Sequence, residues 1–307
     1  MSALTAIQRP AWLAAERWPF PTAELITPVG RIAVTDIGSG PTLLFVHVGS
    51  WSFIWRDLLL ELSPHYRCVT IDAPGSGLST HPDSPVSLRG AAIAAGSVID
   101  ALDLRAITMI LHDVGGPVGL AAAVERPERI AGLVALNALG WRPTGIALRG
   151  MLKLVGSTPA RASGSLSGWL ARLSASSFGA GRHWTRGDRR VFLTGLDRSA
   201  RRNTHRYLNA LRRENDLLGR VEGALREDLA ELPLLTVFGS RNDPFGLATR
   251  WKQFFPTAEQ HIVPGGNHYP MGDDPKVVAE WIGRWHGKHV LPAYNVGPIR
   301  SVHNRIR

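Results

Sequence analysis

Residues 106–119, AITMILHDVGGPVG, contain the sharpest change of pattern in the chain. The run from Ile107 to Leu111 is apolar and partly β-branched, which predicts a short buried strand. It ends at His112-Asp113-Val114-Gly115-Gly116, and an alanine-rich segment typical of a helix follows. A strand that turns so abruptly into a helix needs small residues where the two backbones approach each other, and the two glycines meet that need. The side chain at the apex of the predicted turn is the carboxylate of Asp113.

A carboxylate in this place indicates a particular chemistry. It is a poor attacker of acyl carbons, because the anhydride product is itself reactive, but it can displace a leaving group at a saturated carbon and leave an alkyl ester. Water must then hydrolyse that ester, which requires a base and an oxyanion site. The alternative is that Asp-Val-Gly-Gly forms only a tight loop after a strand.

The rest of the chain alternates in the same way. Strands are predicted over 24–27, 31–36, 42–47, 67–72, 107–111, 130–136, 232–239 and 260–263, and helices over 51–62, 87–102, 118–124 and 276–285. Strands that alternate with helices predict a doubly wound, mostly parallel sheet of the α/β class. From 140 to 231 strand signals are missing and basic, helix-like segments dominate, which predicts an inserted helical cap. The predicted division is therefore a core over 1–139 and 232–290, a cap over 140–231 and a surface tail over 291–307.

Composition limits the class of protein. The 307 residues are 44% hydrophobic, enough for a sizeable core, and carry a net charge of +10. Between Trp141 and Ala230 there are 17 Lys+Arg and 7 Asp+Glu, so the whole excess lies in the predicted cap. These basic residues lack interleaved aromatics, which favours a solvated helical face over a nucleic-acid site. An anionic surface or partner stays open as an alternative.

Targeting and cofactor signals are missing from the sequence. No stretch of about 18 apolar residues predicts a transmembrane helix, and the first 25 residues lack the apolar core of a secretory signal. A cytoplasmic location is therefore expected. A single cysteine, Cys68, excludes a disulfide framework, and the histidines do not form a metal-ligand pattern, so we expect neither a metal nor a cofactor. The oligomeric state cannot be predicted.

The segments DIGSGPTLLFVH, WSFIWRDLLLEL and YRCVTIDAPGSGLS, followed by the Asp113 turn, resemble the α/β-hydrolases whose nucleophile is an aspartate. Haloalkane dehalogenases are the most similar group, and epoxide hydrolases come next. The resemblance implies an α/β-hydrolase fold with a nucleophile elbow, a cap after the sixth strand and a histidine base near the end. It extends over most of the chain.

On this resemblance three residues form a catalytic triad. Asp113 is the nucleophile, and His268, in the glycine-rich turn PGGNHYP, is the base that activates water. Asp243, in GSRNDP, is the acid that orients His268, because the alternative position in the family holds the uncharged Asn137. The backbone N–H groups of Val48 and Val114 form the oxyanion hole. Substrate contacts are expected from His47, Trp51, Trp141 and Tyr207.

Two departures keep the subtype open. Haloalkane dehalogenases hold the departing halide with an indole directly after the nucleophile and often an asparagine after the first histidine, whereas this chain has Val114 and the sequence HVGSW. Trp51 or a cap tryptophan (Trp141, Trp169 or Trp184) is the possible substitute. Epoxide hydrolases use two cap tyrosines, and the predicted cap has only Tyr207. The prediction is a dehalogenase-like hydrolase acting on a mainly apolar small molecule. The alternatives are an epoxide hydrolase, a β-lactone-processing relative or a non-catalytic ligand-binding protein.

Overall fold

In the computed structural model residues 4–294 are described, and one nine-stranded sheet runs through them in the order β1-β2-β3-β5-β4-β6-β7-β8-β9. Its strands are β1 (Thr5–Ala6), β2 (Ala23–Thr27), β3 (Gly30–Ile37), β4 (Thr42–Val46), β5 (Arg67–Ile71), β6 (Ile107–His112), β7 (Ile130–Leu136), β8 (Leu234–Gly239) and β9 (Glu259–Val263). β1 to β3 pair antiparallel, as do β3 and β5, and the strands from β5 to β9 pair in parallel. The predicted mostly parallel sheet is confirmed.

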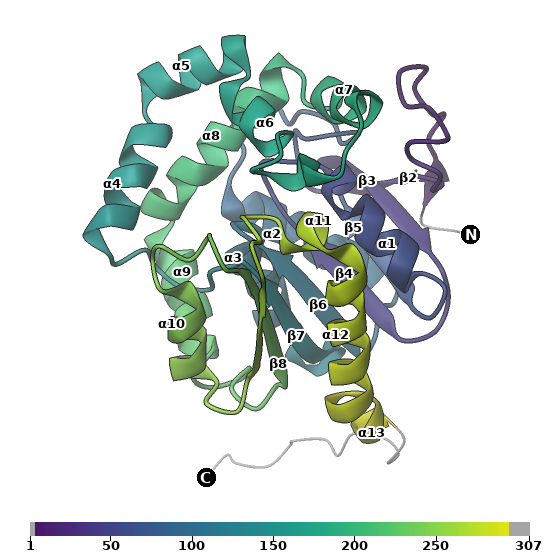
Figure 1. Cartoon of the computed structure of the whole chain (residues 1–307), viewed down its shortest axis with the longest axis vertical. Helices are drawn as coiled ribbons and strands as arrows, with labels where there is room; N and C mark the ends of the chain where they lie inside the picture. Colours follow the sequence, from purple (N-terminus) through teal and green to yellow (C-terminus); the bar gives the residue numbers. More distant parts are fainter. Residues whose placement is uncertain (1–3, 295–307) are drawn as a thin grey trace.

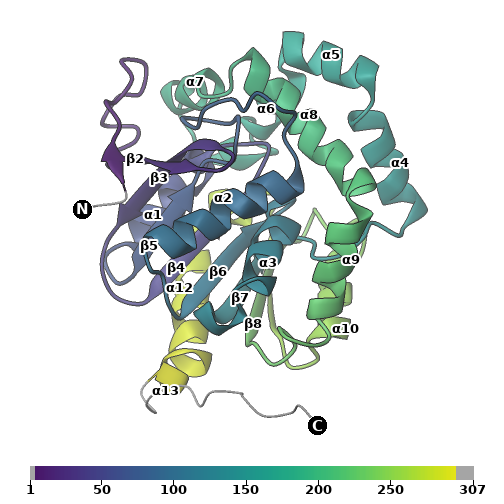
Figure 2. The same cartoon turned by 180° about the vertical axis from the view of Figure 1, so that it is seen from behind.

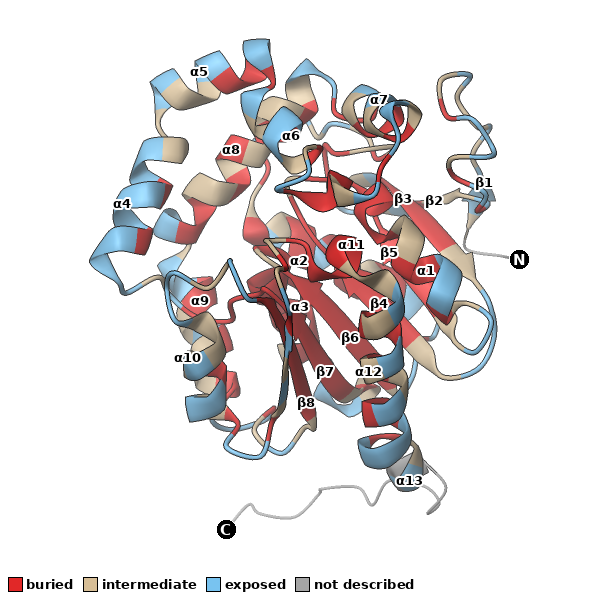
Figure 3. Cartoon of the chain, in the orientation of Figure 1, coloured by how far each residue is buried: buried red, intermediate tan, exposed pale blue. Residues whose placement is uncertain are grey.

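Helices cover both faces of this sheet, as Figures 1 and 2 show from opposite sides. One face carries α1 (Arg56–Leu62), preceded by η1 (Ser52–Trp55), and α12 (Pro275–His289); the other carries α2 (Leu88–Ala101) and α3 (Gly115–Val124). A hydrophobic core lies on each face of the sheet. Strand β4 contributes side chains to both, because successive side chains point to opposite faces. Leu44 and Val46 pack with α2 and α3, while Leu43 and Phe45 pack with α1 and α12. The buried central strands in Figure 3 follow from this arrangement.

The described chain between β7 and β8 is helical. It forms α4 (Ile146–Val155), α5 (Thr158–Ser167), α6 (Trp169–Ser174), η3 (Ala180–Arg182), α7 (Arg186–Thr194), α8 (Arg198–Arg213) and α9 (Asn215–Ala224). α4 to α8 lie beyond the carboxyl ends of the strands, and α9 packs against α3 in the core (Figure 1). Within the insertion, α4 and α5 both pack on α8. The exact division at residues 140 and 231 stays a prediction.

Two cap side chains tie α8 to the turn that follows β5. The hydroxyl of Tyr207 donates to the carbonyl of Pro74 at 2.9 Å, and the amide of Asn203 donates to the carbonyl of Gly75 at 3.1 Å. Both side chains are buried. Two buried hydrogen bonds therefore attach the cap to the turn that follows β5.

The helix near the carboxyl end is longer than predicted. After α10 (Leu247–Phe254), β9 and α11 (Pro270–Asp273), helix α12 continues to His289, beyond the expected end at Trp285. Trp285 and Val290 are buried in the core beside α1, and this packing carries the helix past its predicted end. α13 (Leu291–Tyr294) occupies the beginning of the predicted surface tail, and the division at residue 291 stays a prediction. Residues 295–307 of that tail lie outside the described residues.

Candidate active site

Asp113 stands at a strained turn between β6 and α3. Its φ is +48°, in the left-handed region that is costly for a residue with a side chain. A Cβ on Gly115 would lie 2.3 Å from the carbonyl oxygen of Val46, and one on Gly116 would lie 1.9 Å from that of Leu139. Only glycine fits at both positions, as the sequence predicted. The turn lifts the carboxylate beyond the end of β6, with 32% of the side chain exposed.

His268 faces this carboxylate. Its Nε2 atom lies 3.5 Å from Oδ2 of Asp113, although 155 residues separate the two in sequence. Burial acts to raise the pKa of Asp113, but the nearby His268, His112 and the Val114 N–H together hold that pKa below its usual value. Asp113 is therefore a carboxylate anion at neutral pH, the form in which it acts as a nucleophile.

The loop that carries His268 is held from three directions. The amide of Asn137 donates to the carbonyl of Asn267 at 2.8 Å, and the carboxylate of Asp273 accepts from the Asn267 N–H. Nε2 of His112 bonds the backbone carbonyl of His268 at 3.0 Å. Asn137, whose φ is +42°, thus fixes the base loop through backbone contacts. Because these contacts leave the His268 ring free, the loop can present its imidazole to Asp113.

The partner of the other ring nitrogen differs from the prediction. Nδ1 of His268 lies 3.1 Å from the side-chain amide nitrogen of Asn242. Asp243, the expected acid, instead accepts from the N–H groups of Leu247 at 2.6 Å and Ala248 at 3.0 Å, at the start of α10. The structure therefore brings Asp113 and His268 together but does not bring Asp243 to the imidazole. Its carboxylate is occupied as a helix cap.

The expected oxyanion donors lie close to the nucleophile. Val114 follows Asp113 directly, and its N–H hydrogen-bonds the carboxylate. A Cβ on Gly115 would lie 2.6 Å from Cα of His47, so the elbow packs directly on the corner that carries Val48. This contact brings the two backbone segments together, and the oxyanion hole stays a prediction.

The four side chains expected to contact substrate are all buried, and most of their polar atoms are already bonded. The indole N–H of Trp51 donates to the carbonyl of Phe192 at 3.0 Å, and the Tyr207 hydroxyl is bonded to Pro74. Trp141 packs edge to face against Trp251 and stacks on Phe254, both of α10. His47 accepts from the Trp55 indole through Nδ1, whereas its buried Nε2 has no hydrogen-bond partner among the described residues.

The remaining cap tryptophans, Trp184 and Trp169, make their contacts outside the catalytic pair. The indole N–H of Trp184 lies 3.3 Å from a carboxylate oxygen of Asp57, and the ring of Trp169 is 38% exposed beside His205. Each tryptophan therefore has a contact that accounts for its position in the fold. Neither bonds Asp113 or His268.

Some residues around the site carry no sequence signal. The ring centroid of Tyr269 lies 4.7 Å from that of His112 and 5.0 Å from that of His268. Its hydroxyl lies 3.1 Å from Ser174 Oγ in the cap. Burial, with the Asp113 charge, raises the pKa of Tyr269 to about 12, so the phenol stays protonated. In the sequence, the one indication that Tyr269 lies at the site is its position directly after His268. The sequence does not indicate Asn242, because the adjacent Asp243 carries the carboxylate expected of a triad acid.

Comparison with known proteins decides the family. The model of the alpha/beta hydrolase family matches residues 43–281, which span the elbow, the cap and the base loop. The chain belongs to the alpha/beta hydrolase family. As predicted, it is an α/β-fold hydrolase, with dehalogenase-like and epoxide-hydrolase-like relatives.

Two curated relatives match this α/β hydrolase over most of their length. Haloalkane dehalogenase 2 of Mycobacterium tuberculosis (strain ATCC 25618 / H37Rv) is 26% identical over 267 residues, which cover 85% of this chain and 93% of the relative. The cis-3-alkyl-4-alkyloxetan-2-one decarboxylase of Shewanella oneidensis is 26% identical over 304 residues, covering 92% and 94%. The chain is thus similar to enzymes named for two different substrates.

Solved structures agree on the fold. A loop variant of a haloalkane dehalogenase from Bradyrhizobium elkanii has a TM-score of 0.73 at 17% identity, covering 90% of this chain and 99% of that one. The epoxide hydrolase CorEH has a TM-score of 0.75 at 18% identity, covering 87% of this chain and 98% of that one.

No helix in residues 4–294 of this α/β hydrolase is long and apolar enough to cross a membrane. The same residues contain no group of three His, Cys, Asp or Glu that could hold a metal ion.

Proposed function

We propose that this α/β hydrolase is a dehalogenase-like enzyme that acts through an ester on Asp113. The carboxylate attacks a saturated carbon of a mainly apolar small molecule, and the leaving group departs with the electron pair of the broken bond. His268 then takes a proton from water, whose oxygen attacks the ester carbonyl and releases an alcohol and free Asp113. The N–H groups of Val48 and Val114 stabilise the oxyanion of this second step. The observation that carries the proposal is the Asp113–His268 pair at 3.5 Å on the elbow.

A β-lactone is the second candidate substrate class, and the bonded state of the tryptophans favours it. A departing halide needs N–H donors, but position 114 is a valine and the Trp51 indole is bonded to Phe192. When a carboxylate opens a β-lactone at its saturated ring carbon, the leaving group is a carboxylate within the same molecule. Such a group is stable without a proton or a dedicated donor. The Shewanella oneidensis relative is named for a substrate of this class, an oxetan-2-one.

Epoxides fit the site less well. The alkoxide that forms when an epoxide opens needs a proton from an acid in the pocket. Burial raises the pKa of Tyr207, and its hydroxyl is already bonded to the carbonyl of Pro74. We therefore propose that epoxides are the weakest of the three substrate classes. A cytoplasmic location and the lack of a nucleic-acid partner stay predictions of the sequence.

Covalent trapping tests the proposed function. In the His268→Gln variant the first step should proceed and the second should fail, so intact-protein mass spectrometry should detect substrate attached to the chain. The panel is an alkyl bromide, an epoxide and a β-lactone of equal chain length. Asp113→Asn in the same background should abolish the adduct. His65→Gln, at an exposed histidine, is the matched control and should not accumulate one.

The outcomes separate the alternatives. An adduct with the β-lactone alone assigns the substrate class, and one with the bromide alone supports a dehalogenase. If wild type turns over a member of the panel but His268→Gln traps none, Asp113 is not the nucleophile. If wild type binds members of the panel without turnover or adduct, the non-catalytic ligand-binding alternative is correct.

A further inference from the structure

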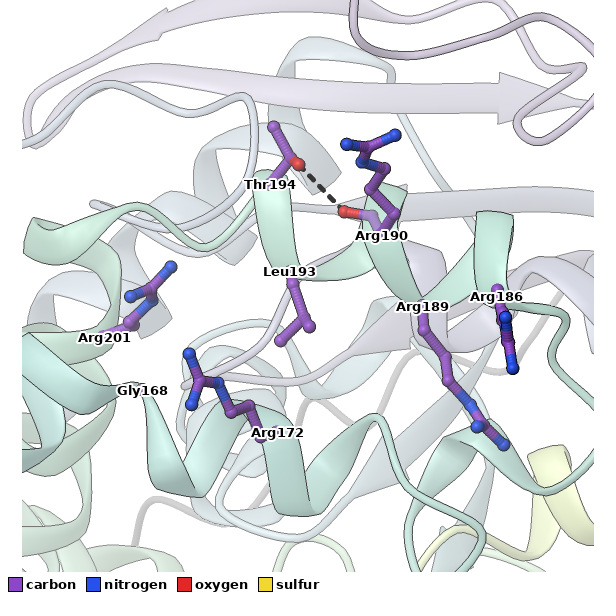
Figure 4. Close-up of a pocket in the computed structure, with 8 residues that line it drawn as sticks. All are labelled: Gly168, Arg172, Arg186, Arg189, Arg190, Leu193, Thr194 and Arg201. Carbon is purple, nitrogen blue, oxygen red and sulfur yellow. Dashed lines mark hydrogen bonds between the residues drawn. The ribbon is translucent and has the colours of Figure 1, made fainter.

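The outer surface of the cap contains a groove of about 630 Å³ between α6, α7 and the beginning of α8. Figure 4 shows Leu193 near its centre, with Arg172 and Arg201 on one side and Arg186 and Arg189 on the other. Arg190 also lines it. The groove does not contain Asp113 or His268. It is therefore a feature separate from the active site.

The charge of this groove is not neutralised. None of its five arginines forms an ion pair with a carboxylate in the part of the chain that the structure describes. Arg189 and Arg201 each donate one hydrogen bond to a backbone carbonyl, of Gly181 and Leu196 respectively, which adds no negative charge. Within residues 4–294, the buried Nε of Arg189 has no hydrogen-bond partner. Like charges held this close favour an anionic ligand.

The acid of α7 and the N-cap acid of α8 both pair with residues outside the groove. Asp188 of α7 bonds Arg56 of the core at 2.6 Å and Arg17 at 3.0 Å. Asp197 caps α8 through the N–H of Ala200 and pairs with His81 at 3.2 Å. Asp188 therefore faces the core, whereas the exposed Asp197 pairs with His81 and not with an arginine of the groove.

Exposed apolar side chains lie on the helices beside the groove. Leu166 is 64% exposed on α5, Leu173 is 51% exposed on α6, and Phe178 is 70% exposed in the segment that follows. Trp169 at the start of α6 is partly exposed as well. Figures 1 and 2 place α5, α6 and α7 at the end of the molecule opposite α13, and Figure 3 shows much of α4 and α5 exposed. Exposed apolar and cationic side chains thus lie on the same group of cap helices.

We propose that this cap face, defined as the five arginines with Leu166, Trp169, Leu173 and Phe178, docks on a bilayer of anionic phospholipid. The guanidinium groups would bond lipid phosphates, and the apolar side chains would enter the interface between headgroups and acyl chains. A soluble phosphate would use the arginines and leave the neighbouring apolar surface without a function. A bilayer uses both. This inference does not depend on the proposed catalytic function.

Vesicle flotation tests the inference with the full chain. Wild type should float with vesicles of phosphatidylcholine and phosphatidylglycerol, stay behind with phosphatidylcholine alone, and dissociate as salt screens the charges. Each arginine near a membrane surface contributes about five-fold in partitioning. The double variant Arg172→Gln/Arg186→Gln should therefore bind roughly 25-fold more weakly. Arg284→Gln/Lys288→Gln, on α12, is the matched control and should bind as wild type.

The apolar half of the cap face has its own variant. Leu173→Ser/Phe178→Ser should weaken flotation while its salt dependence stays the same. The control is Leu60→Ser, at the 49% exposed Leu60 on α1, which should float as wild type does. Circular dichroism of each variant checks that it folds. Equal flotation with neutral and anionic vesicles, or no flotation, would overturn the proposal. Glycerol 3-phosphate that binds in the absence of vesicle binding would make the groove a small-anion site, and tighter binding of a labelled oligonucleotide would make it a nucleic-acid site.

Discussion

The amide of Asn242 lies 3.1 Å from Nδ1 of His268, while the carboxylate of the next residue, Asp243, caps α10. Rotation of the Asn242 amide by 180° about its Cβ–Cγ bond brings its oxygen to the ring. That orientation accepts the Nδ1–H and leaves Nε2 free to take a proton from water, as a base beside Asp113 must do. An amide can thus orient the ring, but it offers no charge to stabilise an imidazolium.

Asn242→Asp should therefore speed hydrolysis of the ester. A carboxylate at this position would hold the same tautomer and also stabilise the imidazolium that forms as water attacks. We expect a gain of at least roughly ten-fold, short of the about 10⁴-fold that separates an aspartate from an amide in a built triad. The measurement is the decay of the covalent adduct in a single turnover. Asn215→Asp, at an exposed position, is the control. A decay unchanged by Asn242→Asp would show that this side chain does not act on His268.

Asp243→Ala should lower stability more than activity. Its carboxylate accepts two backbone N–H bonds at the start of α10, and the loss of such a cap costs about 1 kcal/mol. The midpoint of urea unfolding should fall, while turnover stays within a few-fold of wild type. Asp243→Ser, which keeps a capping oxygen, should recover most of the stability. A thousand-fold loss of turnover with unchanged stability would instead make Asp243 the acid that the sequence predicted.

The contrast between the elbow and this loop shows what the sequence could predict. The continuous apolar run of β6 and the glycine pair that follows it indicate the turn, so the position of Asp113 could be predicted. The loop after β8 has no such pattern. Whether Asn242 or Asp243 faces His268 depends on the path of one turn, which neighbouring residue types do not reveal.

The same limit applies to buried donors. The sequence shows that Trp51 and Tyr207 carry N–H and O–H groups but not which acceptors they meet. Those acceptors are the backbone carbonyls of Phe192 and Pro74, far away in the chain. Backbone acceptors are present at every residue, so only the fold selects them.

Wild type should release chloride from 1-chloroalkanes slowly. The loss of one well-placed donor to a developing anion costs about 3–4 kcal/mol, or roughly 100- to 1,000-fold in rate. Val114 has no side-chain donor, and the Trp51 indole is bonded to Phe192. Trp51→Phe should therefore change halide release little while lowering stability by about 1 kcal/mol. Ion chromatography of chloride and urea unfolding are the two measurements. Brisk chloride release that Trp51→Phe abolishes would place the halide site at Trp51.

Acid should destabilise this hydrolase through two buried histidines. Burial and the neighbouring His112 lower the pKa of His47 to about 3, and burial and the neighbouring His268 lower that of His112 to about 3. The unfolded chain takes up protons at these residues below about pH 6.5, whereas the folded chain does so only near pH 3. The stability they contribute is thus complete above pH 6.5 and falls with the pH below it. As the pH falls from 7 to 5, each of the two histidines should lower the free energy of unfolding by about 2 kcal/mol.

Urea unfolding as a function of pH measures this loss, and His47→Gln isolates one of the two groups. A glutamine oxygen can still accept from the Trp55 indole that now donates to His47 Nδ1 at 2.9 Å. The variant should therefore lose less stability than wild type between pH 7 and pH 5, by about the 2 kcal/mol of one histidine. His65→Gln, at an exposed histidine, should keep the wild-type dependence. Should His47→Gln fail to fold, wild type alone decides, since a stability that stays constant from pH 7 to pH 5 would mean that the buried histidines do not resist protonation.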